Sequence, residues 1–571
     1  MKPFNYIKNW LGNQEHLFYL FLFILIIPNI VLCFTEPMPV VAKIANVLLP
    51  LACYYWIMTL SRNCGKMFWI LFLFIFFGAF QIVLLYLFGQ SIIAVDMFLN
   101  LVTTNSSEAM ELLDNLIPAL VTIVIIYIPA LILAMVSIIY KRKVSAGFIR
   151  RERIRSYLFL VIGFISLGSA YAFDKKYEIT SDLYPLNVCY NVVLAVERDA
   201  QTRNYAETSK DFTFQAKATH DKSKREIYVL VVGETSRALN WELYGYERIT
   251  NPELTKVPNL SIFTDVLTLS NTTHKSVPML MSAISSENFD SIYQQKGIIT
   301  AFKEAGFKTA FFSNQRYNDS FIDFFGKEAD TWDFIKEDEG VANQNLSDDE
   351  LLKLVENVLA KDDQKLFIVL HTYGSHFNYR ERYPASNAFF MPDSPADAKF
   401  KYRDNLVNAY DNSIRYTDDF LARLIGMLNS QPAETAMLYT SDHGEDIFDD
   451  SRHLFLHASP VPSYYQLHVP YIIWTSDSYR EAYPEQIHAL ESNKQKAVAS
   501  SCAVFHTMLD LAGVQTPLLN DSFSVASPLY TEHPRYYLND HNEPHSFFDL
   551  GLSKKDFEMF EKMKIKMDKE K

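Results

Sequence analysis

The sequence predicts a multi-pass α-helical membrane domain with five spans, followed by an α/β domain whose sheet is mostly parallel. Long apolar stretches dominate the first third of the 571 residues, whereas the rest has the composition of an acidic soluble protein. From Arg225 onward, short apolar β-rich runs alternate with helical stretches. Polar side chains follow several of these runs directly. A chain of this length is expected to fold as at least two domains.

Each of the five apolar stretches has about the length that crosses a bilayer core, roughly 17 to 25 residues. A soluble protein would rarely bury five such helices in succession. The first stretch is too long for a removed signal peptide and lacks its small-residue cleavage site. The expected spans are residues 16–34, 40–60, 67–88, 117–140 and 156–173.

Lysine and arginine predict the orientation of these spans. Seven of these basic residues lie within 141–155, between the fourth and fifth spans, whereas 89–116 contains none and carries four acidic residues. The positive-inside rule therefore predicts a cytoplasmic N-terminus. Everything after Phe173 is then expected outside, which for a bacterial inner-membrane protein is the periplasm.

Charge and cysteine content exclude two classes of protein. The net charge of −13 argues against nucleic acid as a partner, because phosphate binding requires a basic face. Three of the five cysteines lie in or beside the spans, and the remaining Cys189 and Cys502 do not make a disulfide framework. The exported domain must therefore be held together by its own core.

Changes of composition divide the chain into four parts. The expected parts are a transmembrane domain at 1–173, a membrane-proximal linker at 174–224, an exported α/β domain at 225–552 and a charged C-terminal tail at 553–571. The tail is rich in lysine and has apolar residues at helical spacing. This pattern favours a solvated surface helix over a membrane patch or a partner site.

The strands expected in the exported domain are continuously apolar, as in parallel strands buried on both faces. They cover residues 227–232, 309–312, 366–370, 436–440 and 469–474. The polar residues that follow four of them are Glu234, Asn314, His371 and the pair Asp442-His443. Because ligands bind at the carboxyl ends of parallel strands, these side chains are expected to share one rim.

Carboxylate and imidazole side chains together suit zinc. Asp442-His443 alone could equally be a polar turn that caps a strand, but together with Glu234 it predicts a zinc site. A hydroxyl-rich turn, Asn271-Thr272-Thr273, leads into an apolar helical run. A threonine there is more commonly an N-cap. The alternative is a nucleophile beside the metal, with backbone amides holding a phosphate, and the rim of ligands favours it.

Several motifs resemble the lipid phosphoethanolamine transferases of the alkaline phosphatase and sulfatase superfamily. They occur in the family's order, and the resemblance covers nearly the whole chain. The motifs are VVGETSRALNWELYGYERITNPEL (231–254), TTHKSVP (272–278), LHTYGSHFNYRERYP (370–384), NAYDNSIRYTDDFL (408–421), SDHGE (441–445) and HASP (457–460). The resemblance implies a sheet of alkaline phosphatase type. It also implies a zinc enzyme that moves phosphoethanolamine from phosphatidylethanolamine to lipid A or the lipopolysaccharide core.

The same resemblance implies roles for individual residues. It implies Glu234, Asp442 and His443 as ligands of one tightly bound zinc, and Thr273 as the nucleophile and a further ligand; a second zinc is left open. Residues implied to contact substrate are His376, His457, Asn314, His371, Asn100 and Glu108. His376 and His457 would bind the phosphate group or a second zinc. His371 could equally have a structural role, and Asn100 and Glu108 also fit a plain helix start.

The sequence departs from the family at a few positions. Leu269 and Met279 stand where a disulfide brackets the nucleophile in many members, and Phe377-Asn378 replaces a Gly-Pro pair. These departures suggest a separate branch and bear on the acceptor rather than the chemistry. Two alternatives are a phosphoglycerol transferase of the same superfamily and a lipid-sensing membrane protein without catalysis. The Cys/Ser-x-Pro-x-Arg context of a sulfatase nucleophile does not occur at 273–278.

Overall fold

The chain forms two compact units. The computed structural model describes residues 10–36, 38–88, 92–103, 106–174, 177–221, 223–337, 346–395 and 398–567. One unit, called the membrane unit below, comprises Met1–Val102 and Leu112–Glu197. The other, the α/β unit, comprises Thr103–Glu111 and Arg198–Lys571.

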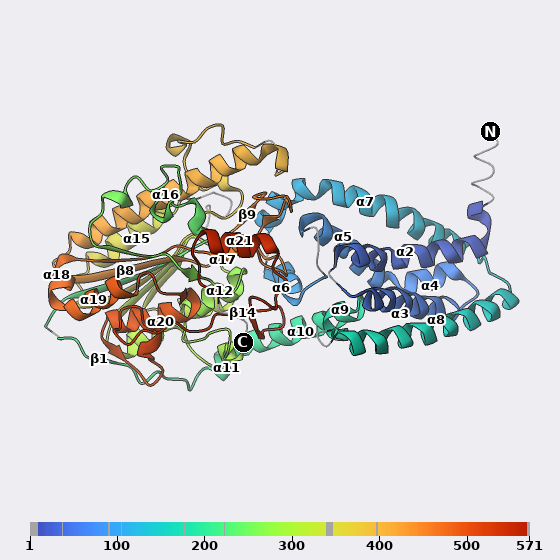
Figure 1. Cartoon of the computed structure of the whole chain (residues 1–571), viewed down its shortest axis with the longest axis horizontal. Helices are drawn as coiled ribbons and strands as arrows, with labels where there is room; N and C mark the ends of the chain where they lie inside the picture. Colours follow the sequence, from blue (N-terminus) through green and yellow to red (C-terminus); the bar gives the residue numbers. More distant parts are fainter. Residues whose placement is uncertain are drawn as a thin grey trace. The chain divides into compact units, whose positions relative to one another are not determined.

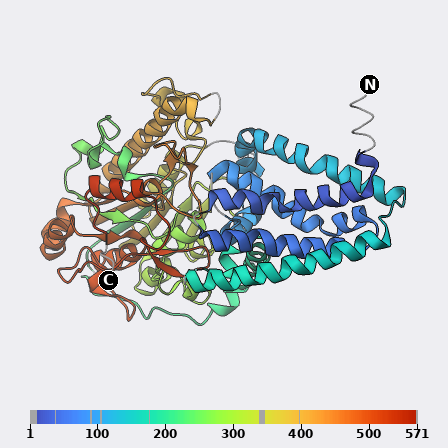
Figure 2. The ribbon, with the colours of Figure 1, turned by 45° about the vertical axis from the view of Figure 1, so that its right-hand side comes forward.

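The membrane unit is helical, and its helices α2, α3 and α8 lie side by side (Figure 2). Within the described residues, four helices are long and apolar enough to cross a membrane, or five if α4 and α5 form one broken span. The sequence predicted this third span as unbroken, but α4 and α5 meet at an angle of 62°. The helices are α2 (Gln14–Thr35), α3 (Val40–Met58), α4 (Cys64–Ile70), α5 (Phe72–Phe88), α6 (Val95–Thr103), α7 (Ser106–Ile139), α8 (Ala146–Phe173), α9 (Ile179–Asp182) and α10 (Leu186–Arg203).

Short polar side chains begin three of these helices. The side chains of Asn13, Asn63 and Ser145 accept a backbone N–H from the first turn of α2, α4 and α8. These bonds satisfy donors that have no partner within a helix, which explains why each helix begins where it does.

The α/β unit is built on one seven-stranded sheet. In spatial order the strands are β3 (Leu260–Phe263), β11 (Tyr471–Thr475), β8 (Glu434–Ser441), β2 (Glu226–Gly233), β7 (Lys365–His371), β5 (Lys308–Ser313) and β6 (Thr331–Phe334). Strands β8, β2, β7, β5 and β6 are parallel neighbours. β11 was expected to be parallel like the others, but it runs antiparallel to both β8 and β3. Its apolar run could not reveal this because both orientations bury the same side chains.

Shorter elements surround this sheet. The two-stranded pairs are β1 (Lys217–Ala218) with β13 (Val514–Gln515), β4 (Val266–Leu267) with β12 (Val498–Ala499), β9 (Asp446–Ile447) with β10 (Phe455–Leu456), and β14 (Tyr536–Leu538) with β15 (Pro544–Ser546). The helices are α11 (Tyr205–Thr208), α12 (Thr273–Leu280), α13 (Ile298–Glu304), α14 (Phe321–Gly326), α15 (Asp349–Leu359), α16 (Arg403–Asn429), α17 (Tyr464–Leu467), α18 (Asp477–Ala482), α19 (Pro484–Asn493), α20 (Ser500–Leu511) and α21 (Lys554–Lys562).

Helices cover both faces of the sheet, with α12 and α20 on one side and α15 and α16 on the other (Figure 1). Every residue of β2 is buried. Its alternate residues Tyr228, Leu230 and Val232 join the apolar cluster that includes α12, α13 and α20. Successive side chains of a strand point to opposite faces, so the residues between them pack toward the second helical layer. This double burial accounts for the continuously apolar strands.

The C-terminal helix α21 is part of the fold. The sequence predicted a solvated helix, but Phe560 is 1% exposed and its ring lies 5.3 Å from that of Tyr464. Asp556 is fully buried and pairs with Arg452 at 2.6 Å. The apolar residues at helical spacing, which the sequence already shows, form the face that packs against the core. All five cysteines are free thiols.

Candidate active site

The register of the central strands brings three ligand side chains together. Gly233 of β2 pairs with Ser441 of β8. The residues that follow these two strands, Glu234 and Asp442, therefore lie side by side. Ligand atoms of Glu234, Asp442 and His443 all lie within 4.8 Å of one another. All three residues are buried, at 0–1% exposure.

The backbone around Glu234 is shaped to hold this group. Thr235 adopts a φ of 59°, which is unusual for a β-branched residue, and its N–H donates to Asp442 Oδ1 at 3.1 Å. Gly374, at φ 50°, lies against the same turn, where an added Cβ would come within 2.7 Å of the Glu234 carbonyl oxygen. Only glycine fits this close approach.

The orientation of His443 exposes one nitrogen to the group. Its Nδ1 lies 3.0 Å from the carbonyl oxygen of Gly444. Because a carbonyl can only accept, Nδ1 carries the proton and Nε2 is the atom available as a ligand. That Nε2 lies 3.2 Å from Asp442 Oδ2 and 3.6 Å from Glu234 Oε1.

Burial sets the charge states of the three side chains. Burial, and then the nearby charge of Asp442, raises the pKa of Glu234 to about 7. Burial also raises the pKa of Asp442 to about 6 and lowers that of His443 to about 3. Two crowded carboxylates beside a neutral imidazole would be stabilised in their charged form by a divalent cation. The oxygen and nitrogen donors suit zinc, so the residues present fit the predicted metal.

Thr273 adds a hydroxyl to this group. It is the first residue of α12, and its Oγ1 lies 3.1 Å from His443 Nε2 and 3.4 Å from Glu234 Oε2. The N-cap position is occupied by Thr272, whose side chain makes no capping hydrogen bond. Of the two interpretations of this turn, the geometry favours a hydroxyl directed at the ligand group over a helix cap.

His457 and His376 lie on the open side of the group. The His457 ring is 4.2 Å from that of His443 and 6.0 Å from that of His376. His457 Nδ1 bonds Glu445 Oε1 at 3.0 Å, and His376 Nδ1 bonds the carbonyl of Phe377 at 2.6 Å. Burial opposes protonation of His457, but the hydrogen bond and charge of Glu445 outweigh it and raise the pKa. Both rings thus keep Nε2 for a ligand.

Two predicted substrate-binding residues lie deeper. Asn314 is fully buried, and its Nδ2 donates to Asp348 Oδ1 at 2.8 Å rather than reaching the ligand group. Its neighbour Gln315 does reach it, since Nε2 donates to Glu234 Oε2 at 3.1 Å. Successive side chains at the end of β5 point to opposite sides, which explains why Gln315 rather than Asn314 reaches the ligand group. His371, 1% exposed, bonds Ser313 Oγ at 3.0 Å, and burial lowers its pKa to about 3.

Asn100 and Glu108 belong to the helices α6 and α7. Their side chains lie outside the described part of the chain, and the lipid contact implied for them stays a prediction.

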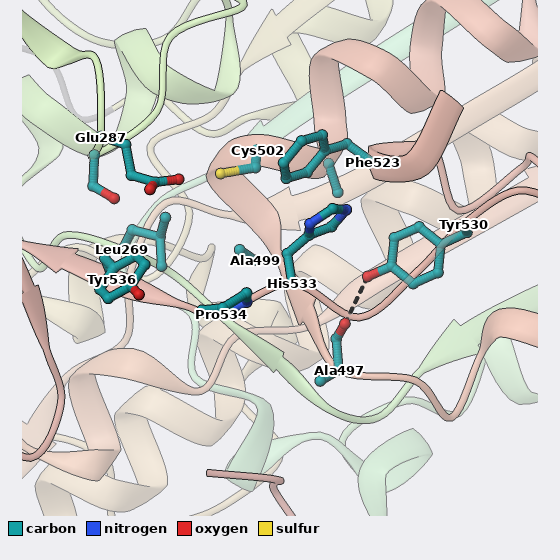
Figure 3. A pocket seen from close by; sticks show the side chains of 12 residues that line it. Leu269, Glu287, Ala497, Ala499, Cys502, Phe523, Tyr530, His533, Pro534 and Tyr536 are labelled. Carbon is teal, nitrogen blue, oxygen red and sulfur yellow. Dashed lines mark hydrogen bonds between the residues drawn. The ribbon is translucent and has the colours of Figure 1, made fainter. Parts of the chain in front are cut away.

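A small cavity lies apart from the ligand group (Figure 3). Leu269, one of the two residues that stand where the sequence comparison expects a disulfide, is buried and lines this cavity. In the same view Cys502 turns its sulfur toward Glu287, and the Tyr530 hydroxyl donates to the carbonyl of Ala497 at 2.6 Å. The residues that line this cavity do not include any of the predicted site residues.

Comparison with known proteins identifies one family. The sulfatase family model matches residues 226–514. Phosphoethanolamine transferase EptC of Escherichia coli K12 is 27% identical over 330 residues, which are 55% of this chain and 56% of that protein. Kdo(2)-lipid A phosphoethanolamine 7''-transferase of the same strain is 29% identical over 315 residues, 53% of each chain. The chain thus spans about half the length of the curated relatives it matches.

Solved structures share the fold of this chain. The C-terminal periplasmic domain of EcEptC from Escherichia coli, in complex with Zn, superposes with a TM-score of 0.54 at 25% identity. That match covers 59% of this chain and 96% of the domain. The integral membrane protein EptA of Neisseria meningitidis matches 89% of this chain and 97% of its own, with a TM-score of 0.64 at 21% identity. The second match extends the shared fold across both units.

Proposed function

The chain belongs to the sulfatase family, and from that premise we propose that it transfers phosphoethanolamine from phosphatidylethanolamine to lipid A or the lipopolysaccharide core. The observation that carries the proposal is the Thr273 hydroxyl, 3.1 Å from His443 Nε2 at the edge of a buried ligand group. Relatives named as phosphoethanolamine transferases support the transferred group, and one of them is named for Kdo(2)-lipid A.

Glu234, Asp442 and His443 would hold zinc, with Thr273 as a further ligand. Bound there, zinc would lower the pKa of the Thr273 hydroxyl and offset negative charge on a phosphoryl group. The solved zinc complex of the EcEptC domain supports this choice of metal. Gln315 and the Thr235 N–H would orient the two carboxylates through their hydrogen bonds at 3.1 Å each.

The proposed reaction has two displacements. Thr273 Oγ1 attacks the phosphorus of phosphatidylethanolamine, the new O–P bond forms as the P–O bond to diacylglycerol breaks, and diacylglycerol leaves as an alcohol with the proton that the Thr273 hydroxyl loses. An oxygen of the acceptor then attacks the phosphoethanolamine on Thr273 and restores the hydroxyl. His376 and His457 would hold the phosphate oxygens or move these protons through Nε2.

The membrane unit fits a reaction between two lipids. Its apolar helices would keep the α/β unit at the membrane that contains the donor and acceptor, which raises their effective concentration. In this proposal the α/β unit lies in the periplasm of a bacterial inner-membrane protein. Asn100 and Glu108 would face the donor lipid.

Mass spectrometry tests the proposal. Lipopolysaccharide from cells that express the chain should gain the mass of phosphoethanolamine, and cells that express Thr273→Ala should not produce it. Intact-protein and peptide masses should also show phosphoethanolamine on Thr273. A phosphoglycerol mass instead would identify the alternative donor, and unmodified glycolipid and protein from a folded, zinc-loaded chain would contradict the proposal.

A further inference from the structure

His457 lies on an irregular loop that needs external support. The loop runs between β9 and α17, and four of its residues, none of them glycine, adopt positive φ: Phe448 (53°), His453 (54°), Leu456 (68°) and Ala458 (60°). L-residues adopt this region only where their surroundings enforce it. The pairing of β9 with β10 covers only two residues on each strand. Bonds within the loop, such as that from the Phe448 N–H to the Leu454 carbonyl at 2.8 Å, are supplemented by side chains outside it.

Asn271 provides a first connection, and it lies two residues before Thr273. Its Nδ2 donates to the carbonyl of Ser459 at 2.8 Å and to Gln466 Oε1 at 2.6 Å. The N–H of Ala458 donates to the backbone carbonyl of Asn271 at 3.2 Å. Because the Ser459 carbonyl can only accept, these bonds fix which way the Asn271 amide points. The turn that contains Thr273 is thus tied to the segment directly after His457.

Gln466 extends the connection to the start of the loop. Its Nε2 donates to Asp446 Oδ2 at 2.5 Å and to Ser459 Oγ at 3.0 Å. Asp446 follows Glu445, whose carboxylate holds Nδ1 of His457. Gln466 and Asp446 are 1% and 2% exposed, so water does not compete for these bonds. Through Ser459 and Gln466, both ends of the loop are therefore connected to the Asn271 amide.

Tyr537 closes the network from a part of the chain beyond the family match at 226–514. Its hydroxyl donates to Asn271 Oδ1 at 2.6 Å, and the ring is 4% exposed. The neighbouring Leu538 N–H donates to the carbonyl of Leu269 at 2.8 Å. β14 thus supports the nucleophile turn through its backbone and the Asn271 amide through one hydroxyl.

We propose that Asn271 and Tyr537 are positioning residues, which set where the His457 imidazole lies relative to the Thr273 hydroxyl. The inference rests on the proposed transfer through Thr273 with His457 at the phosphate. Neither residue touches the reacting atoms. A small displacement of a group that acts in the transition state lowers the rate much more than it changes binding of the lipids.

The test is a double-mutant cycle with Tyr537→Phe and His457→Ala. Tyr537→Phe removes one oxygen and should lower kcat for transfer from fluorescent phosphatidylethanolamine by about tenfold, with KM nearly unchanged. In the His457→Ala background the same substitution should change kcat by less than about twofold, because the group it positions is absent. Equal losses in both backgrounds would show a general structural effect and overturn the proposal.

Tyr530→Phe is the matched control (Figure 3). Tyr530 is also buried, at 5% exposure, and its hydroxyl makes one 2.6 Å bond, but to the carbonyl of Ala497 rather than to a site loop. Tyr530→Phe should leave kcat unchanged, although it should lower Tm as much as Tyr537→Phe does. A loss of kcat equal to that of Tyr537→Phe would contradict the proposal.

Hydrogen exchange on the full-length protein separates this inference from the proposed function. Peptides that cover residues 446–463 should exchange faster in Tyr537→Phe than in the wild type or in Tyr530→Phe. This result is independent of turnover. If the wild type transfers no phosphoethanolamine, the proposed function fails; if these peptides are equally protected in all three proteins, the positioning role fails.

Discussion

The two halves of the candidate site are built in different ways. Glu234 and Asp442 follow adjacent parallel strands, so the register of the sheet places them and Oδ1 of Asp442 bonds the next turn. His457 lies on a loop with little regular structure, and buried side-chain hydrogen bonds from Asn271 and Gln466 hold it. The strand-end half is therefore expected to tolerate changes in remote segments, whereas the loop half depends on them.

The largest expected effect comes from the nucleophile, whose hydroxyl lies against the strand-end half. Thr273→Ala removes the hydroxyl that lies 3.1 Å from His443 Nε2, and transfer should fall by about 10³-fold or more because no other nucleophile replaces it. Product masses on lipopolysaccharide measure the loss. Zinc content should stay near that of the wild type, since the three buried side chains remain. Substantial transfer by the purified variant would exclude Thr273 as the nucleophile.

His457→Ala tests the loop half. The imidazole lies 4.2 Å from the His443 ring but is absent from the group of three ligand residues. Transfer should fall by about 10²-fold, in the range expected for loss of an acid–base or phosphate-binding group. Zinc affinity, measured by competition with a chelator, should change little. A variant that loses zinc together with activity would show that the two halves act as one metal site.

The sequence predicts the site residues best where they directly follow strands of the sheet. Glu234, Asp442 and His443 were placed on one rim because parallel strands align their carboxyl ends, and their ligand atoms do lie within 4.8 Å. Five of the seven strands of the central sheet followed from the same pattern, with ends within two residues of the predicted ones, whereas β3 and β6 were not predicted. The antiparallel direction of β11 and the 62° bend between α4 and α5 could not follow, since neither changes the apolar pattern.

The remaining site residues depend on contacts between distant parts of the chain. Asn271, Gln466 and Tyr537 carry no motif of their own, and their roles arise only from bonds that span 195 and 266 residues. The resemblance implies Asn314 as the substrate contact, because the motif marks the segment but not the face of each side chain. The face is set by where β5 ends, and predicted strand boundaries are accurate only to a few residues.

A carboxylate outside the site tests how burial and charge are balanced. Glu328 accepts from the Gly297 N–H at 3.0 Å and from Thr300 Oγ1 at 2.8 Å, and burial raises its pKa to about 7, as it does for Glu234. Unlike Glu234, it has no partner ligands for a cation among the described residues. Its stabilising effect should therefore depend on pH alone.

The folded state binds the Glu328 proton more tightly than the unfolded chain, whose glutamate pKa is near 4.5. Its contribution to stability is therefore full below that pH and is lost as pH rises through 7, by on the order of 2–3 kcal/mol. Glu328→Gln keeps an acceptor oxygen and should flatten this part of the pH dependence in urea unfolding. Glu481→Gln, at a solvent-exposed glutamate, is the control. If the unfolding free energy of Glu328→Gln changed with pH as steeply as that of the wild type, other carboxylates would account for the pH dependence.

The smallest expected effect concerns a side chain that orients a ligand without binding metal itself. Gln315 Nε2 donates to Glu234 Oε2 at 3.1 Å and to the carbonyl of Thr372 at 3.0 Å, so it fixes the rotamer of that carboxylate. Gln315→Ala should weaken zinc affinity about tenfold, which is the lower end of the range expected when a metal ligand loses an orienting hydrogen bond. The melting temperature of the zinc-free protein should stay nearly unchanged. Asn314→Ala serves as the contrast. The Asn314 amide holds Asp348, so its loss should lower the stability of the protein rather than its zinc affinity. If Asn314→Ala weakened zinc binding more than Gln315→Ala did, the ligand group would be oriented through Asn314 and Asp348 instead of through Gln315.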